Sequence, residues 1–161
     1  MTTPRLIDDI DAAESCVLRA YPDPLSPAGV EISHGRSGLG RSGDPWTIGW
    51  GHTGPEVHQG LIWTQAQADA ARDLDIKHAC DALDRAFPWW RQMSDPRQDV
   101  LANMTFNMGI VRLSKFVNTL EAMRLGDYEA AAAGMLASLW ARQVGNRAKR
   151  LAQQMRTGQH P

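Results

Sequence analysis

The chain has 161 residues, 43% of them apolar, and its 17 basic and 18 acidic side chains leave a formal net charge of −1. This apolar fraction is too high for a disordered chain, and the length fits one domain. The small net charge and the absence of a reading motif argue against nucleic-acid binding. The halves differ, since residues 1–96 carry −6 and residues 97–161 carry +5. The basic half could face an anionic polymer or form an ordinary solvated surface.

Cysteine usage and the N-terminal sequence predict where the protein is made. Cys16 and Cys80 belong to no CxxC pair and fall at helix-like apolar positions, which is typical of core residues in a reducing compartment. We expect no signal peptide, because three aspartates between residues 8 and 11 interrupt any apolar stretch. The longest largely apolar stretch, residues 130–141, has 12 residues, which is too short for a bilayer of roughly 30 Å. We therefore expect no stable membrane association.

The first third of the chain predicts a helix, a loop and a strand. Apolar residues at Leu6, Ile10, Ala13 and Val17 predict an amphipathic helix that ends only before the prolines of 21–24. Five glycines within 25–44 predict a flexible segment, in which residues 30–32 could form a short strand. The β-forming residues of 46–52 predict a strand at the edge of a small sheet.

The rest of the chain predicts helices, beginning with a capping box at Thr64–Gln67. In chain order, these helices run from Thr64 to before Pro88, from Asp95 to before Gly109, over 114–125 up to Gly126, from Asp127 to near Gly145, and from Asn146 onward. The predicted fold class is mainly α (α+β). We expect a single domain over 1–161, with a β-containing lobe at about 22–62 and a helical lobe that includes the first helix.

Most kinds of catalytic chemistry leave no pattern in this sequence. The five histidines form no HExxH pair and no zinc spacing occurs, so we predict no metal and no cofactor. Phosphate-binding loops and the serine nucleophile elbow are also absent.

Carboxylate chemistry remains. Glu14 borders the apolar stripe of the first helix, where partial desolvation would suit a general acid, although an ordinary surface glutamate fits the same position. Asp23 follows in a proline-bracketed turn, and two such carboxylates can hydrolyse a glycosidic bond.

Four separated blocks of the sequence form a specific pattern. They are Glu14 with Asp23 after eight intervening residues, Trp-Thr-Ile-Gly-Trp-Gly-His at 46–52, Asn-Met-Thr-Phe-Asn-Met-Gly at 103–109, and Asn-Arg-Ala-Lys-Arg at 146–150 followed by Arg-Thr-Gly at 156–158. In this order the blocks resemble the phage-type lysozymes of glycoside hydrolase family 24, over nearly the whole chain. The resemblance implies a lysozyme-like fold, with the active-site cleft between a small β-containing lobe and a helical lobe.

The resemblance also implies roles for single residues. Glu14 would be the general acid that protonates the glycosidic oxygen, Asp23 the second carboxylate that supports the attacking water, and Thr47 the residue that orients this water in an inverting displacement. The other implied residues contact the substrate (Tyr21, Phe106, Asn107 and Thr119), contact the catalytic glutamate (Arg147), or form a structural histidine–aspartate pair (His52 and Asp73).

The chain departs from the family pattern at one place above all. Between Asp23 and Thr47 there are 23 residues, where the family usually has only a few. Glu31 and Asp44 lie in this glycine-rich insertion and are rival candidates for the second carboxylate. In addition, Gly134 replaces a polar cleft residue, which implies altered contacts with the sugar.

The resemblance implies a muramidase, an endolysin that hydrolyses the β-1,4 bond between N-acetylmuramic acid and N-acetylglucosamine in bacterial peptidoglycan. Its partner is then the peptidoglycan glycan strand, and we expect a monomer. Made in the host cytoplasm without a signal peptide, it would reach the wall (periplasm) only after a separate holin-like protein permeabilises the membrane. Two alternatives remain open, a lytic transglycosylase acting on the same bond and a wall-binding or virion-structural homologue without activity.

Overall fold

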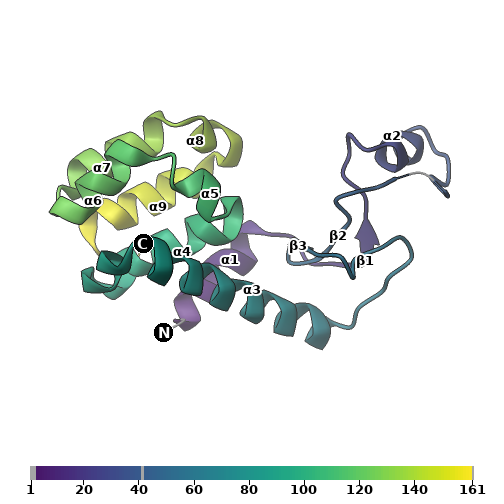
Figure 1. Ribbon diagram of the computed structural model, residues 1–161, viewed down its shortest axis with the longest axis horizontal. Coiled ribbons are helices and arrows are strands. Elements are labelled where there is room, and N and C mark those ends of the chain that lie inside the picture. Colours follow the sequence, from purple (N-terminus) through teal and green to yellow (C-terminus); the bar gives the residue numbers. More distant parts are fainter. Residues whose placement is uncertain (1–2, 41, 161) are drawn as a thin grey trace. The chain divides into compact units, whose positions relative to one another are not determined.

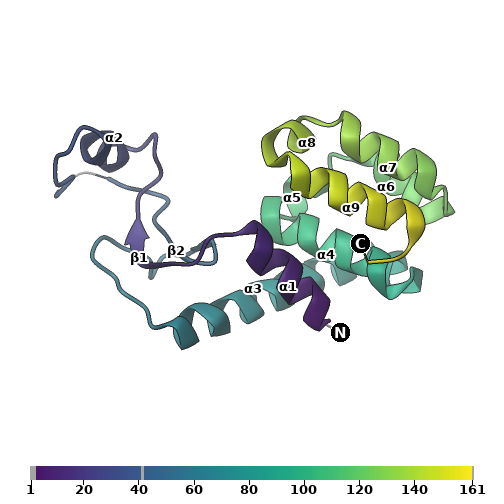
Figure 2. The same ribbon diagram turned by 180° about the vertical axis from the view of Figure 1, so that it is seen from behind.

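A computed structural model describes residues 3–40 and 42–160 of the chain. Most of it is helical and it has one small antiparallel sheet, so the prediction of a mainly α fold is confirmed (Figure 1, Figure 2). The chain forms two compact units. Residues Asp11–Asp75 form the unit that contains the sheet, here called the sheet unit. Residues up to Ile10 and from Ile76 onward form the helical unit.

Three strands form the sheet of the sheet unit, in the order β1–β2–β3. The strands are β1 (Val17–Tyr21), β2 (Thr47–Gly49) and β3 (His52–Thr53), and both neighbouring pairs are antiparallel. The register places Tyr21 opposite Thr47. Buried apolar residues, among them Trp46 and Ile48, form a small core beside the sheet. The sheet unit therefore has its own core and its own backbone pairing.

The first helix, α1 (Pro4–Ala13), is shorter than predicted. Leu6 and Ile10 are buried as expected, but Val17 begins β1 instead of continuing the helix. The prediction of one helix up to residue 20 is wrong because Val17–Tyr21 pairs with β2. That long-range pairing satisfies the backbone of a segment whose β-branched and aromatic residues also suit a strand.

The insertion after Asp23 folds around a short helix, α2 (Pro27–Ser33), where we predicted a loop with a strand at 30–32. The Ser26 side chain accepts a hydrogen bond from the Gly29 backbone N–H at 3.1 Å and caps this helix. Gly29 is required by close packing, since a Cβ there would lie 2.1 Å from the Asp23 carbonyl oxygen. The missed signal is a capping serine followed by proline at the first helical position.

Thr64 and Gln67 form the predicted capping box at the start of α3. The Thr64 backbone N–H donates to Gln67 Oε1 at 2.8 Å, and the Gln67 N–H donates to Thr64 Oγ1 at 3.2 Å. The helices and the 3-10 helix from here onward are α3 (Gln65–Ala86), η1 (Pro88–Gln92), α4 (Asp95–Met108), α5 (Ile110–Leu113), α6 (Val117–Leu125), α7 (Tyr128–Ala137), α8 (Leu139–Val144) and α9 (Asn146–Thr157).

The helical unit differs from the prediction mainly at helix ends. A separate turn of helix, α5, lies between α4 and α6, and the predicted alanine-rich helix is divided into α7 and α8. Ser138 causes this division, because its extended backbone ends α7 and its side chain accepts from the Ala141 N–H at 3.1 Å to begin α8. Gly126 ends α6 in a left-handed conformation with φ of 78°, as predicted.

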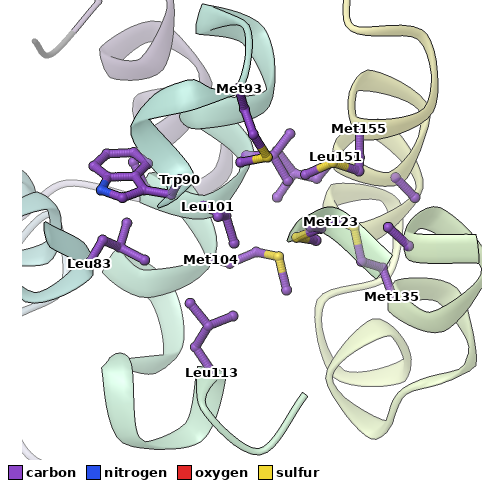
Figure 3. Close-up of a cluster of buried hydrophobic side chains, with 14 of the residues drawn as sticks. Leu83, Trp90, Met93, Leu101, Met104, Leu113, Met123, Met135, Leu151 and Met155 are labelled. Atoms are coloured by element: carbon purple, nitrogen blue, oxygen red, sulfur yellow. The ribbon is translucent and has the colours of Figure 1, made fainter. Parts of the chain in front are cut away.

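Methionine, leucine and tryptophan side chains fill the core of the helical unit (Figure 3). Met104 of α4, Met123 of α6 and Met135 of α7 are fully buried within it. Trp140 and Cys80 are buried too, which agrees with their interpretation as core residues, whereas the same prediction for Cys16 is wrong because Cys16 is only half-buried. Helices α6, α7 and α9 lie side by side in both views of the fold (Figure 1, Figure 2). Within the described part of the chain, no helix combines the length and the apolar character needed to cross a bilayer.

His52 connects β3 to α3 inside the sheet unit. Its Nδ1 lies 2.7 Å from Asp75 Oδ2, and its Nε2 lies 2.8 Å from Glu56 Oε1. The predicted pair of His52 with Asp73 is wrong, because Asp73 instead accepts from Arg72. Two residues apart on a helix, Asp73 and Asp75 point about 200° away from each other, so only one of them can face β3. The prediction thus chose an aspartate on the side of α3 that faces away from His52.

We predict that His52→Gln destabilises the protein most at mildly acid pH. Burial lowers the pKa of His52, but the hydrogen bonds and charges of Glu56 and Asp75 outweigh burial and raise it above 6.5. Because the pKa is raised on folding, the stabilisation is fully present below the unfolded pKa and is lost as pH rises through the folded pKa. The hydrogen bond from His52 lowers the pKa of Glu56. The stabilisation that Glu56 contributes is therefore lost only as pH falls toward 4.5 and below.

Thermal unfolding of the wild type and of His52→Gln, at about pH 5.5 and about pH 9, measures how the loss of stability depends on pH. The gap in melting temperature between wild type and His52→Gln should narrow at the higher pH. His78→Gln, which removes an exposed histidine of α3, is the control. A gap of equal size at both pH values would contradict the proposed ion-pair origin.

Candidate active site

Glu14 occupies the bend between α1 and β1. It directly follows Ala13, the last residue of α1, and its side chain is half-buried. A Cβ added to Gly51 would lie 3.9 Å from Glu14 Oε2, so the carboxylate lies beside the turn between β2 and β3. Gly51 has a φ of 89°, which a residue with a side chain adopts rarely. The backbone conformation therefore favours glycine at this position, whereas the distance to Glu14 is an ordinary van der Waals contact.

Tyr21, on β1, lies close enough to this carboxylate for its charge to affect the phenol, and Thr47 lies on the neighbouring strand β2. Burial raises the pKa of the Tyr21 phenol, the negative charge of Glu14 raises it further, and a hydrogen bond with the Thr47 side chain lowers it. The two residues are also direct partners in the strand register. The structure thus brings three of the predicted site residues, Glu14, Tyr21 and Thr47, into one group within the sheet unit. A carboxylate, a phenol and a hydroxyl together can donate protons and hold a water molecule.

Asp23 follows β1 by two residues in a tight turn. Its Oδ1 accepts a hydrogen bond from the Leu25 backbone N–H at 2.7 Å, and its own N–H donates to the Gly43 carbonyl oxygen at 3.0 Å. The second bond ties the two ends of the insertion together. Asp23 therefore keeps a position fixed by β1 on one side and by the closed base of the insertion on the other.

The two rival carboxylates have different surroundings. Glu31 lies on α2, where its Oε2 is 2.6 Å from Arg36 Nε in an ion pair. Asp44 is exposed, and its Oδ2 accepts from the Ser42 hydroxyl at 3.1 Å. The ion pair of Glu31 is of a kind common on protein surfaces, and the hydrogen bond of Asp44 is of a kind common for aspartates in turns. Of the three carboxylates, Asp23 lies nearest in sequence to the strand that carries Tyr21.

Asn107 belongs to a second group, in the helical unit. Its Oδ1 accepts a hydrogen bond from Trp140 Nε1 at 2.9 Å. The rings of Phe116 and Trp140 pack in a T-shaped arrangement, with their centroids 6.4 Å apart. These residues, with Arg112 and Lys115 among others, line an open hollow of about 690 Å³. Aromatic surface, an amide and two cations suit a polar, partly anionic ligand. The partnership between Asn107 and Trp140 was not predicted, and residues 33 positions apart give no local signal of it.

The other predicted residues of the helical unit lie deeper. Thr119 is buried against α7, where a Cβ on Gly134 would lie 2.3 Å from Thr119 Oγ1. Gly134, which we expected to alter contacts with the sugar, thus makes room for Thr119. Arg147 is buried on α9, and its Nε donates to Asn103 Oδ1 at 2.9 Å. Phe106 is half-buried and packs on the core of the helical unit.

Sequence reasoning missed Glu56 and Asp75, the two carboxylates that hold His52. Glu56 lies in the turn after β3 and Asp75 lies on α3, so no local pattern in the sequence marks either of them as a partner of His52. Over residues 3–40 and 42–160, no three histidine, cysteine, aspartate or glutamate side chains gather as metal ligands would.

Comparison with known proteins relates this chain to phage lysozymes. The phage lysozyme family matches residues 11–157. The pre-baseplate central spike protein Gp5 of Enterobacteria phage T4 is 36% identical over 88 residues, which are 54% of this chain and 15% of the spike protein. Endolysins of Lactococcus phages c2 and phivML3 are each 37% identical over 71 residues, 42% of this chain and 30% of the endolysin. The matches thus span less than a third of each relative. The family match, in contrast, covers most of this chain, which therefore belongs to the phage lysozyme family.

Proposed function

We propose that this protein is a muramidase, which hydrolyses the β-1,4 bond between N-acetylmuramic acid and N-acetylglucosamine in peptidoglycan. The observation that carries this proposal is the grouping of Glu14, Tyr21 and Thr47 in a member of the phage lysozyme family. Glu14 supplies a half-buried acid, and the half-buried Thr47 supplies a hydroxyl on the neighbouring strand. Asp23, fixed at the end of β1, supplies the second carboxylate.

The proposed reaction is a single displacement. Glu14 donates its proton to the glycosidic oxygen as the bond between this oxygen and the anomeric carbon breaks. A water molecule held by the Thr47 hydroxyl attacks the same carbon from the opposite face, and Asp23 accepts a proton from that water. The product has the inverted configuration. Carboxyl groups in inverting enzymes stand about 6.5–9.5 Å apart, and this spacing leaves room for the water.

The biological setting is also a proposal. Endolysins are among the relatives, which supports a role in host cell lysis. The protein would then accumulate as a monomer in the host cytoplasm and act on the wall after a holin-like protein has opened the membrane. The match to the T4 spike protein supports a second candidate, a wall-acting or wall-binding part of a virion. Purified protein that binds peptidoglycan but releases no new sugar ends would favour the binding role.

Glu14→Gln is expected to abolish hydrolysis while the fold is retained, because an amide donates no proton to the leaving oxygen. General acid catalysis is worth about 10²–10⁴-fold in rate. Release of reducing ends from purified peptidoglycan measures the rate, and circular dichroism checks the fold. Glu121→Gln, which removes an exposed carboxylate paired with Arg124, is the control. Wild-type turnover in Glu14→Gln would refute the mechanism, and anhydro-muramic ends in the products would identify a transglycosylase instead.

Asp23→Asn should lose most activity, whereas Asp44→Asn and Glu31→Gln should keep it. Asp23 is fixed by β1 and by its hydrogen bond to Gly43, and a catalytic carboxylate needs such a rigid support. The three variants are compared by lytic rate on one wall preparation, so each serves as a control for the others. An inactive Asp44→Asn beside an active Asp23→Asn would show that the insertion has moved the second carboxylate.

Lysis should weaken as salt is added, because residues 97–161 carry +5 and the wall is anionic. Screening acts over about 10 Å at 0.1 M salt. Replacing both Arg112 and Lys115, which line the hollow, by Gln should flatten this salt dependence. Lys77→Gln, in the acidic half, is the control, and it should leave the salt dependence of lysis unchanged. Wild-type activity that is constant from low to high ionic strength would mean that the basic half is only a solvated surface.

A further inference from the structure

One face of α3 carries a continuous polar stripe within the sheet unit. Gln65, Asp69 and Arg72 are separated by four and then three residues, so they lie on the same side of the helix. Each member contacts a different segment of the sheet unit. The contacts are Gln65 with Cys16, Asp69 with Trp50, and Arg72 with Asp11. A face that packs on its own unit is usually apolar, so these polar contacts call for an explanation.

Arg72 is the most buried member of the stripe, with 8% of its surface exposed. Its Nη1 donates to both carboxylate oxygens of Asp11, at 2.8 and 2.6 Å. Its Nε and Nη2 both donate to Asp73 Oδ1, at 3.1 and 3.0 Å, and its guanidinium carbon lies 5.6 Å from the centre of the Trp50 ring. A buried arginine is costly unless such partners compensate for lost water. Here the partners include one from α1 and one from the turn after β2.

These contacts lie on both sides of Glu14. Asp11 is three residues before it, on the last turn of α1, and Cys16 is two residues after it. Trp50, which donates to Asp69 Oδ1 at 2.8 Å, directly precedes Gly51, the residue beside Glu14 Oε2. Glu14 itself lies on a bend directly after the last residue of α1. The stripe on α3 therefore fixes the segments on which the position of the bend depends.

We propose that Arg72 is a positioning residue for the Glu14 carboxylate, acting through Asp11 and Trp50. The inference rests on the proposed function, in which Glu14 delivers a proton to the glycosidic oxygen. A displacement of about 1 Å in such a group can cost on the order of 10²-fold in turnover, even when the mutated residue is distant from the substrate. Loss of the Arg72 contacts with Asp11 and Trp50 would loosen the segments on both sides of the bend and shift the Glu14 carboxylate. Substrate binding, which uses other contacts, would change little.

Kinetics on soluble glycan strands test this proposal in Arg72→Met, Arg72→Lys and Asp11→Asn. With rates expressed per folded enzyme, Arg72→Met and Asp11→Asn should lower kcat about tenfold or more and leave KM within about twofold. The alkaline limb of the pH–rate profile should also move, because a general acid acts only while it is protonated and the surroundings of Glu14 change. Arg72→Lys should recover part of the loss, because an ammonium group can still donate to Asp11. The double variant Arg72→Met/Asp11→Asn should be no slower than Arg72→Met, since the two substitutions remove the same interaction.

Asp81→Asn is the matched control. It removes an aspartate of α3 whose Oδ2 lies 2.6 Å from Lys77 Nζ in an exposed pair. If the Arg72 and Asp11 variants keep wild-type kcat, or if Asp81→Asn lowers kcat as much as they do, the positioning role is overturned. Should Arg72→Met fail to fold, Asp11→Asn and Arg72→Lys decide by the same criteria. A wild-type protein that releases no sugar ends would instead refute the proposed function, and this inference with it.

Discussion

The pairing of β1 with β2 is the interaction on which the candidate site depends. It turns the chain out of α1 after Ala13, so that Glu14 lies on a bend and Tyr21 comes opposite Thr47. A helix continued through Val17 would have carried the residues after Glu14 away from β2. Backbone hydrogen bonds between strands distant in sequence thus decide where the acid is placed.

The insertion between these strands is compatible with that pairing because its two ends are joined. The hydrogen bond from the Asp23 N–H to the Gly43 carbonyl oxygen closes its base, and a second bond, from the Ala28 N–H to the Ser42 carbonyl oxygen, continues the connection. Loop-closure entropy grows only slowly with length, so a long insertion with a fixed base disturbs the register little. Helix α2 then occupies residues that would otherwise form a long unstructured loop.

The sequence alone predicted the helices with strong local signals. It also predicted β structure at 46–52, but as one strand, whereas the structure has two short antiparallel strands, β2 and β3, joined by a turn. It predicted the capping box at Thr64 and the left-handed end at Gly126 because both depend on residues within four positions. It failed where a distant partner decides the conformation, as in β1, whose apolar spacing fits a helix equally well. The same limit explains the candidate site. Single residues were chosen by resemblance, but the contact of Asn107 with Trp140 and the choice of Asp75 over Asp73 depend on which faces meet in the folded chain.

The polar stripe on α3 argues that stability was not the only constraint on this part of the fold. Well-packed apolar side chains of similar volume often replace a buried ion pair without loss of stability. An apolar contact, however, allows neighbouring segments to slide by small amounts, whereas the two bonds from Arg72 Nη1 to Asp11 fix both distance and direction. A site that delivers a proton needs this kind of precision in the segments around its acid. The stripe therefore has the chemistry expected of a support for geometry, placed on the helix that contacts the segments on both sides of Glu14.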